Sequence, residues 1–85
     1  MVEFHFVLVE MAIKQLPYEV YIDKHAHRHA AEWCKERWGE RWGVIDNSDS
    51  IWCCFWAGTR GPNAGKYRYL FENEEDAIIF TLRWL

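Results

Sequence analysis

The spacing of hydrophobic residues is the feature that most constrains the fold, because it changes three times along the chain between the period of a strand and that of a helix. Residues 2–9 and 66–71 place an aromatic or aliphatic side chain at every second position, which is the period of a strand with one buried face. A shorter extended piece, 18–22, follows Pro17 with its apolar side chains on one side. These three segments are therefore predicted to be strands.

Two further segments are apolar on both faces, as expected of strands inside a sheet. They are residues 41–46 and 51–57, and the small polar residues at 47–50 between them supply turn chemistry. A longer loop rich in Gly and Pro, residues 58–65, leads into the strand at 66–71. The order of segments predicts neighbouring antiparallel strands.

Helical signals frame two other segments. Asp23 is a candidate N-cap and Gly39 a candidate stop, which predicts a helix over residues 24–38. Asn73 precedes three acidic residues, and Arg83 lies in the last turn of residues 74–85, so the charges at both ends suit the helix dipole. We therefore expect one α+β domain over residues 1–85, with an antiparallel sheet of four to five strands and both helices packed on one face.

The composition describes a short chain that builds its core from large side chains. The chain has 85 residues, 51% of them hydrophobic, and six are tryptophan. Aromatic side chains each bury roughly 150–250 Å², so a tryptophan-rich chain can form a core despite its length. The formal net charge of −3 argues against duplex DNA as a ligand, because binding to a phosphate backbone depends on many Lys and Arg contacts.

The same residues suggest a cytoplasmic protein without a membrane segment. The longest apolar run, residues 51–58, is far shorter than the roughly 20 residues of a spanning helix. Acidic residues on both sides of the apolar stretch in residues 1–10 differ from a signal peptide. An odd count of three cysteines predicts reduced thiols.

Three histidines at every second position, residues 25–29, raise the question of a metal site. On a helix they separate, so that His25, His29 and Glu32 share a polar arc while His27 falls on the side that should meet the sheet. The first three could supply imidazole and carboxylate ligands to a divalent ion. The simpler interpretation is a solvated polar face, because the H-E-x-x-H arrangement is absent.

A second possible metal site, a structural zinc, would join His27 and Cys34 to Cys53 or Cys54, since strand alternation sends one of the last two thiols toward the helices. The alternative is that buried cysteines act as small apolar side chains. We expect no cofactor and no catalytic constellation, because a nucleophilic thiolate requires an exposed, electropositive setting. Tyr67 and Tyr69, which alternate with cations, could also stack on single-stranded nucleic acid, although core packing explains them as well.

The last helix carries more apolar surface than one sheet face can cover. Only Thr81 and Arg83 are polar between residues 77 and 85, which predicts either that the helix at 24–38 packs closely alongside or that the remaining apolar side contacts another molecule. We expect Phe80 and Trp84 to mediate that association. Arg60 and Asn63, in the loop at 58–65, are expected to add a loop contact.

The C-terminal stretch YLFENEEDAIIFTLRWL resembles short, uncharacterised proteins of tailed bacteriophages, particularly those infecting marine bacteria, that end in F-x-x-x-E-D-A-x-x-F-x-L-x-W. The residues that carry the resemblance are Phe71, Glu75, Asp76, Ala77, Phe80, Leu82 and Trp84. The resemblance implies a phage origin and action in the host cytoplasm, but no reaction. The sequence thus predicts a non-enzymatic interaction protein that binds a host or phage protein through an aromatic-rich surface and can form a dimer of two copies of this chain.

Overall fold

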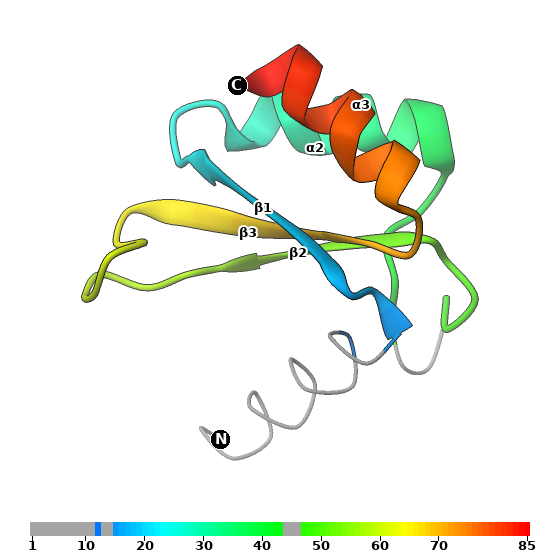
Figure 1. Ribbon diagram of the computed structural model, residues 1–85, viewed down its shortest axis with the longest axis horizontal. Helices are drawn as coiled ribbons and strands as arrows, with labels where there is room; N and C mark the ends of the chain where they lie inside the picture. Colours follow the sequence, from blue (N-terminus) through cyan, green and yellow to red (C-terminus); the bar gives the residue numbers. More distant parts are fainter. Residues whose placement is uncertain (1–11, 13–14, 44–46) are drawn as a thin grey trace.

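The computed structural model describes residues 12, 15–43 and 47–85, and these residues form an α+β fold. The elements are, in chain order, β1 (Tyr18–Asp23), α2 (His27–Trp38), β2 (Trp52–Trp56), β3 (Lys66–Phe71) and α3 (Glu74–Trp84). The three strands form one antiparallel sheet in the order β1-β3-β2, and both helices cover the same face (Figure 1). The predicted class is confirmed, with three strands in the described residues; the strand expected at 2–9 lies outside them.

The segment after α2 differs from the strand expected at 41–46. In its described part, Gly43 makes an isolated bridge with Asn47, and residues 44–46 lie outside the described residues. The Trp42 backbone N–H donates to the Trp52 carbonyl oxygen at 2.7 Å, and the Trp42 indole N–H donates to the Ser48 carbonyl oxygen at 3.1 Å. Trp42 is buried, so its side chain anchors the segment where a strand ladder was expected.

Helix α2 begins three residues later than the sequence suggested. Asp23 is the last residue of β1, and its Oδ1 accepts a hydrogen bond from the His25 backbone N–H at 2.8 Å. The carboxylate therefore closes the turn before the helix, and the N-cap position is taken by Ala26. The predicted stop is confirmed, because Gly39 has a φ of 85° and its N–H donates to the Lys35 carbonyl oxygen.

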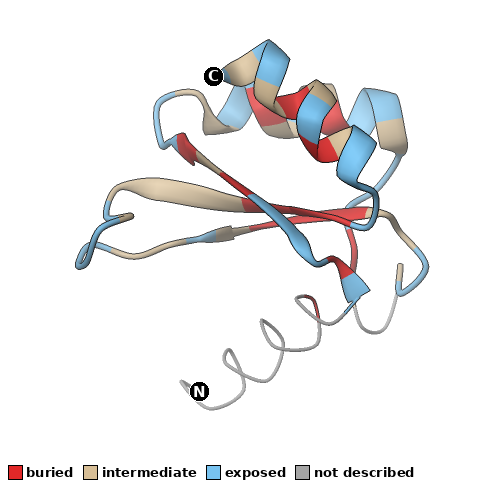
Figure 2. Ribbon diagram, viewed as in Figure 1, coloured by how far each residue is buried: buried red, intermediate tan, exposed pale blue. Residues whose placement is uncertain are grey.

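Alternation along the strands divides the core between the two faces of the sheet. On the helix-facing side, ten buried residues pack together, and they include Tyr69, Phe71 and Phe80. On the opposite side, Cys53 and Leu70 pack with a smaller group from outside the sheet. This smaller group is Ala12, Leu16 and Trp42. Figure 2 shows the buried residues concentrated along the sheet and the sides of the helices that face it.

Helix α3 begins and ends as its charges predict. Asn73 occupies the N-cap position, although its side chain caps no backbone N–H and instead donates to Asp76 Oδ2 at 3.2 Å. Phe80 anchors the middle of the helix, with ring centroids 4.6 Å from Tyr69 and 5.2 Å from Phe71. Within the described part of the chain, neither helix is long and apolar enough to cross a membrane.

Candidate functional site

Among the described residues, two hollows lie at opposite sides of the helix layer and have different chemistry. The first, which we call the α2–β2 cleft, has a volume of about 220 Å³. Its lining residues are His27, Ala31, Glu32, Lys35, Glu40, Arg41, Trp52 and Cys54. The second, which we call the α3–β1 groove, has a volume of about 250 Å³. Its lining residues are Tyr18, Glu19, Val20, Glu74, Ala77, Ile78, Thr81 and Leu82.

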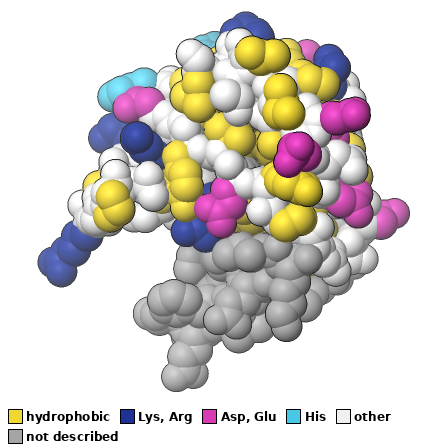
Figure 3. Space-filling model, in the orientation of Figure 1, with side chains coloured by type: hydrophobic (Ala, Val, Ile, Leu, Met, Phe, Trp, Pro, Cys, Tyr) yellow, Lys and Arg dark blue, Asp and Glu magenta, His cyan; other side chains and the backbone are white. Residues whose placement is uncertain are grey.

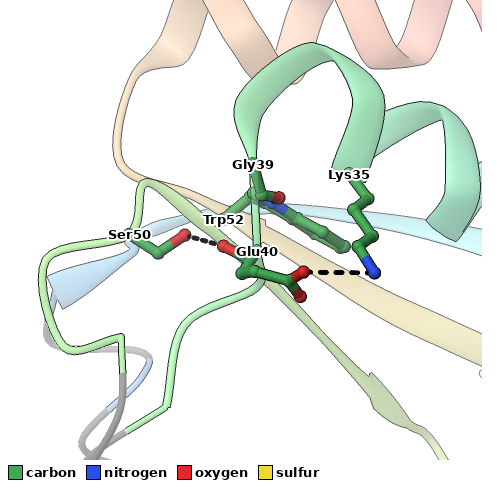
Figure 4. Close-up of polar contacts among 5 residues, drawn as sticks. All are labelled: Lys35, Gly39, Glu40, Ser50 and Trp52. Carbon is green, nitrogen blue, oxygen red and sulfur yellow. Dashed lines mark hydrogen bonds and ion pairs between the residues drawn. The ribbon is translucent and has the colours of Figure 1, made fainter.

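The chain that leaves α2 forms one wall of the α2–β2 cleft. The Trp52 indole N–H donates to the Gly39 carbonyl oxygen at 2.8 Å, and the Ser50 hydroxyl donates to the Glu40 carbonyl oxygen. Lys35 Nζ lies 3.1 Å from Glu40 Oε1, so an ion pair joins the helix to this chain (Figure 4). Both partners of the pair are largely exposed, and such pairs contribute little to stability, so the Trp52 bond is the firmer restraint.

His27 is held by two tyrosines at the start of α2. Its ring stacks on Tyr67 with centroids 3.5 Å apart, and its Nδ1 lies 2.8 Å from the Tyr69 hydroxyl oxygen. The Tyr69 hydroxyl also lies 3.2 Å from the His27 carbonyl oxygen, and when it donates there Nδ1 must be the donor to Tyr69. Burial, and then the charge of Arg41, lower the pKa of His27, which favours a neutral ring.

The cysteines are arranged as buried thiols. Cys54 points toward the helices and Cys53 toward the opposite face, which confirms that alternation separates them. Burial raises the pKa of Cys34 and of Cys54, and raises that of Cys53 to about 12. Arg41 Nη1, 3.8 Å from Cys54 Sγ, opposes this shift at Cys54 but does not reverse it. A nucleophilic thiolate needs a lowered pKa, so these thiols have the character of core residues.

The histidines of the proposed metal set point to solvent. His25 lies in the turn before α2, and His29 and Glu32 are exposed on the helix, where Glu32 Oε1 is 3.9 Å from Arg28 Nε. Among the described residues, no group of three or more His, Cys, Asp or Glu side chains is placed to hold a metal ion. His27 and the cysteines therefore do not form such a group either. Because α2 starts at His27, His25 leaves the helical arc on which the metal set was based.

Part of the uncovered apolar surface of the last helix lies in the α3–β1 groove, which Ile78 and Leu82 line. Ile78 is 51% exposed, Leu82 is 80% exposed and Leu85 is 73% exposed, and β1 adds Tyr18 at 39%. We call these four residues the α3–β1 face. Figure 3 shows apolar side chains gathered over this part of the molecule, with acidic side chains beside them. The prediction that the sheet leaves part of this helix uncovered is confirmed.

The residues that the sequence singled out for association are not the ones at this surface. Phe80 is 0% exposed and belongs to the core, so it cannot reach a partner while the domain is folded. Trp84 is half-buried against the same core, with its Nε1 buried and without a hydrogen-bond partner among the described residues. The expectation for Phe80 is corrected because its ring fills the space above Tyr69 and Phe71.

Arg60 and Asn63 lie together in the loop between β2 and β3, away from both hollows. Arg60 is exposed, whereas Asn63 is half-buried and its carbonyl oxygen accepts a hydrogen bond from the Lys66 backbone N–H at 3.2 Å. Neither residue lines the groove that contains the exposed part of α3. The structure therefore does not bring the loop residues together with the apolar face in one site.

The two tyrosines considered for nucleic-acid stacking have different positions. Tyr69 is 0% exposed, so its ring cannot accept a base. Tyr67 is half-buried with one face against His27 and lies 5.1 Å from the Trp56 ring centroid. The pair does not form a continuous stacking platform.

The sequence prediction named Phe80 and Trp84, whereas the exposed apolar residues of α3 are on another side of the helix, with Tyr18 of β1 also exposed. Ile78, Leu82 and Leu85 follow the spacing i, i+4, i+7 and so share one side of the helix, which the sequence does show. Which side meets the sheet depends on where Phe80 packs, and that requires the tertiary structure. No protein-family model, curated protein or solved structure matches this chain.

Proposed function

We propose that this chain is a non-enzymatic interaction protein that binds another protein through the α3–β1 face. The observation that carries the proposal is the contrast within one helix. Leu82 is 80% exposed and Ile78 is 51% exposed, although Phe80 between them is fully buried. Clustered apolar side chains of this size at a surface mark interaction sites more often than isolated ones do.

The free energy available from this face sets the kind of contact it can make. Full burial of an aliphatic side chain contributes roughly 1.5–3 kcal/mol, so three exposed residues of α3 contribute at most roughly 4–9 kcal/mol. Association itself costs about 4–15 kcal/mol in lost freedom of movement. The apolar residues alone therefore support only weak binding, and a specific complex needs polar contacts next to them.

The resemblance of the C-terminal segment to proteins of tailed bacteriophages gives the proposal its setting. We infer a phage-encoded chain that acts in the host cytoplasm on a host or phage protein. Leu82 is one of the residues that carry the resemblance and also one of the exposed residues of the face. Association with a second copy of the chain is the alternative form of the same proposal, because it would cover the same side chains.

A pair of charge-matched variants tests the proposal. Tagged wild-type protein, Leu82→Glu and Ala64→Glu are used to capture proteins from a bacterial lysate, and the captured proteins are quantified by mass spectrometry. Ala64 is exposed in the loop between β2 and β3, so its variant adds the same charge away from the face. We expect Leu82→Glu to reduce capture of the partner at least about tenfold, since burying an unpaired carboxylate costs more than the roughly 1.4 kcal/mol that tenfold represents.

Circular dichroism is used to check that both variants are folded, and sedimentation is used to determine whether the wild-type chain is a monomer. Ala64→Glu should capture the same proteins as the wild type. Equal capture by all three forms, together with a monomeric wild type, would refute the proposed function.

A further inference from the structure

Among the residues that the structure describes, the outer edge of β1 carries no paired strand. β1 is the first strand in the sheet order β1-β3-β2, and all six of its residues, Tyr18–Asp23, pair with β3 on the inner side. Within the described residues, no segment pairs with the other side. In an edge strand, about half of the backbone N–H and C=O groups point away from the sheet and are ready to pair with an added strand.

The α3–β1 groove lies along this open edge. Tyr18 and Val20 line it from the helix-facing side of β1, and Ile78 and Leu82 line it from α3. Because side chains alternate along a strand, an added strand would send every second side chain toward the same side as Tyr18 and Val20. Those side chains would meet the exposed residues of α3, so the groove selects apolar residues at alternate positions.

The other side of the same edge is acidic. Glu19 and Asp23 are exposed there, and Tyr21 between them donates a hydrogen bond to Glu19 Oε2 at 3.1 Å. The nearby cations are one strand further in, on β3, where Lys66 pairs in register with Asp23 and Arg68 with Tyr21. Arg68 is also held in place, since its Nε donates to the Tyr21 hydroxyl oxygen at 3.0 Å. The charges that an added strand would meet directly are therefore carboxylates.

One register of pairing with a second copy of the chain is disfavoured at this edge. Two β1 strands paired antiparallel, with Tyr21 opposite its own copy, would place Glu19 opposite Asp23 twice. Like charges directly opposite each other destabilise a strand pair, and acidic residues on an edge strand are one way in which proteins avoid pairing with themselves. The carboxylates thus act against this register of self-pairing and in favour of a cationic partner.

We propose that β1 accepts an extended segment of a partner protein as an added strand, with apolar side chains against α3 and Lys or Arg side chains opposite Glu19 and Asp23. Since these two carboxylates are four residues apart on one side of β1, the recognised segment carries two basic residues four positions apart on one side and apolar residues at the alternating positions on the other side. This proposal rests on the proposed function and names the chemistry of its partner. The backbone hydrogen bonds and the two ion pairs supply the polar contacts that the apolar face lacks.

The test uses short peptides of designed sequence. The peptide VKVTVKV has the required pattern in both chain directions, and VEVTVEV replaces its two lysines with glutamates. Binding of each fluorescently labelled peptide to the wild-type protein is followed by anisotropy. Hydrogen exchange of the β1 amides is followed by NMR with and without VKVTVKV.

We expect VKVTVKV to bind at least roughly tenfold more tightly than VEVTVEV, because two attractive cross-strand pairs become repulsive. Alternate β1 amides should become protected on binding, which an added strand requires and a helix lying on α3 would not produce. Glu19→Lys should reduce the preference for VKVTVKV. Glu36→Lys makes the same change of charge at an exposed position of α2 and should keep that preference.

Failure of VKVTVKV to bind at millimolar concentration, or binding without protection of β1, overturns the strand proposal. If Leu82→Glu still releases a captured partner in that case, the proposed function stands and only the mode of binding is wrong. Concentration-dependent dimerisation of the wild type that protects the β1 amides would also overturn it, in favour of self-pairing.

Discussion

The two helices lie on the same face of one sheet, yet only one of them has an outer side suited to water. α2 turns Ala30 and Cys34 inward, and its outer side carries charged residues, with Arg28 and Glu32 one turn apart. α3 buries Ala77 and Phe80 but leaves Ile78 and Leu82 largely exposed. A helix can therefore be fully anchored by one side while its other side keeps apolar residues exposed.

The hollows beside the helices repeat this difference. The α2–β2 cleft is bordered by charges of both signs, and its wall is tied to β2 by the bond from Trp52 to Gly39. The charged residues that line the α3–β1 groove are both acidic, Glu19 and Glu74. The α2–β2 cleft thus has an ion pair of its own, whereas the lining of the α3–β1 groove carries charges of one sign.

The largest expected effect separates the two sides of α3. Phe80→Ala should destabilise the domain by about 3–5 kcal/mol, because it empties the space between Tyr69 and Phe71 in the core. Leu82→Ala, two residues away at an exposed position, should change the free energy of unfolding by about 0.5 kcal/mol or less. Urea unfolding followed by tryptophan fluorescence measures both. A large loss for Leu82→Ala would mean that this side of α3 supports the fold as well.

A smaller effect is expected where α2 ends. Gly39 has φ 85° and ψ −164°, a region that residues with a Cβ atom rarely occupy, although no atom lies within 4 Å of the position that a Cβ would take. Gly39→Ala should therefore cost about 1–3 kcal/mol through backbone strain and not through a clash. Gly43→Ala serves as the control, since Gly43 also has open space around it and is not among the residues with positive φ. Equal losses for the two variants in urea unfolding would contradict the explanation.

The hydroxyl of Tyr69 should contribute less to the free energy of unfolding than Gly39 does. Tyr69→Phe keeps the ring against Phe80 but removes the group that meets His27 Nδ1 and the His27 carbonyl oxygen. We expect a loss of about 1–2 kcal/mol, because a half-buried polar group is left without its partner. Tyr67→Phe retains the ring stacked on His27 and should cost about 0.5 kcal/mol or less. A larger loss for Tyr67→Phe than for Tyr69→Phe would contradict the conclusion that the Tyr69 hydroxyl is the one that stabilises His27.

Much of the fold follows from local patterns that the sequence shows directly. The alternation in β3 and the acidic first turn of α3 depend on neighbouring residues, and both were predicted. The start of α2 was misplaced because Asp23 has two uses for its carboxylate, as a helix cap or as the acceptor in a preceding turn, and the sequence does not choose between them. In residues 41–43, the described part of the strand expected at 41–46, Trp42 packs as an anchor instead, which depends on residues far along the chain.

The candidate site was harder to predict for the same reason. The sequence showed that α3 has too much apolar surface, and this excess is independent of tertiary structure. It did not show which side stays exposed, because Phe80 is fixed by aromatic rings on β3 and the groove is completed by β1, more than fifty residues earlier in the chain. A site made by residues distant in sequence is set by packing and not by a motif.

The smallest expected effect is a dependence of the free energy of unfolding on pH, which His27 at the start of α2 should cause. His27 is packed against Tyr67 and Tyr69 with Arg41 nearby, and burial followed by the charge of Arg41 lowers its pKa below the ordinary value of 6.5. The unfolded chain then binds a proton at His27 more readily than the folded chain does. The stability that neutral His27 contributes is therefore complete above its unfolded pKa and is lost as the pH falls through its folded pKa. Between about pH 8 and about pH 5, the wild type should lose more unfolding free energy than His27→Gln does. Arg41→Gln removes the second cause and should raise the pKa of His27 in an NMR titration, whereas an unchanged pKa would show that burial alone is responsible.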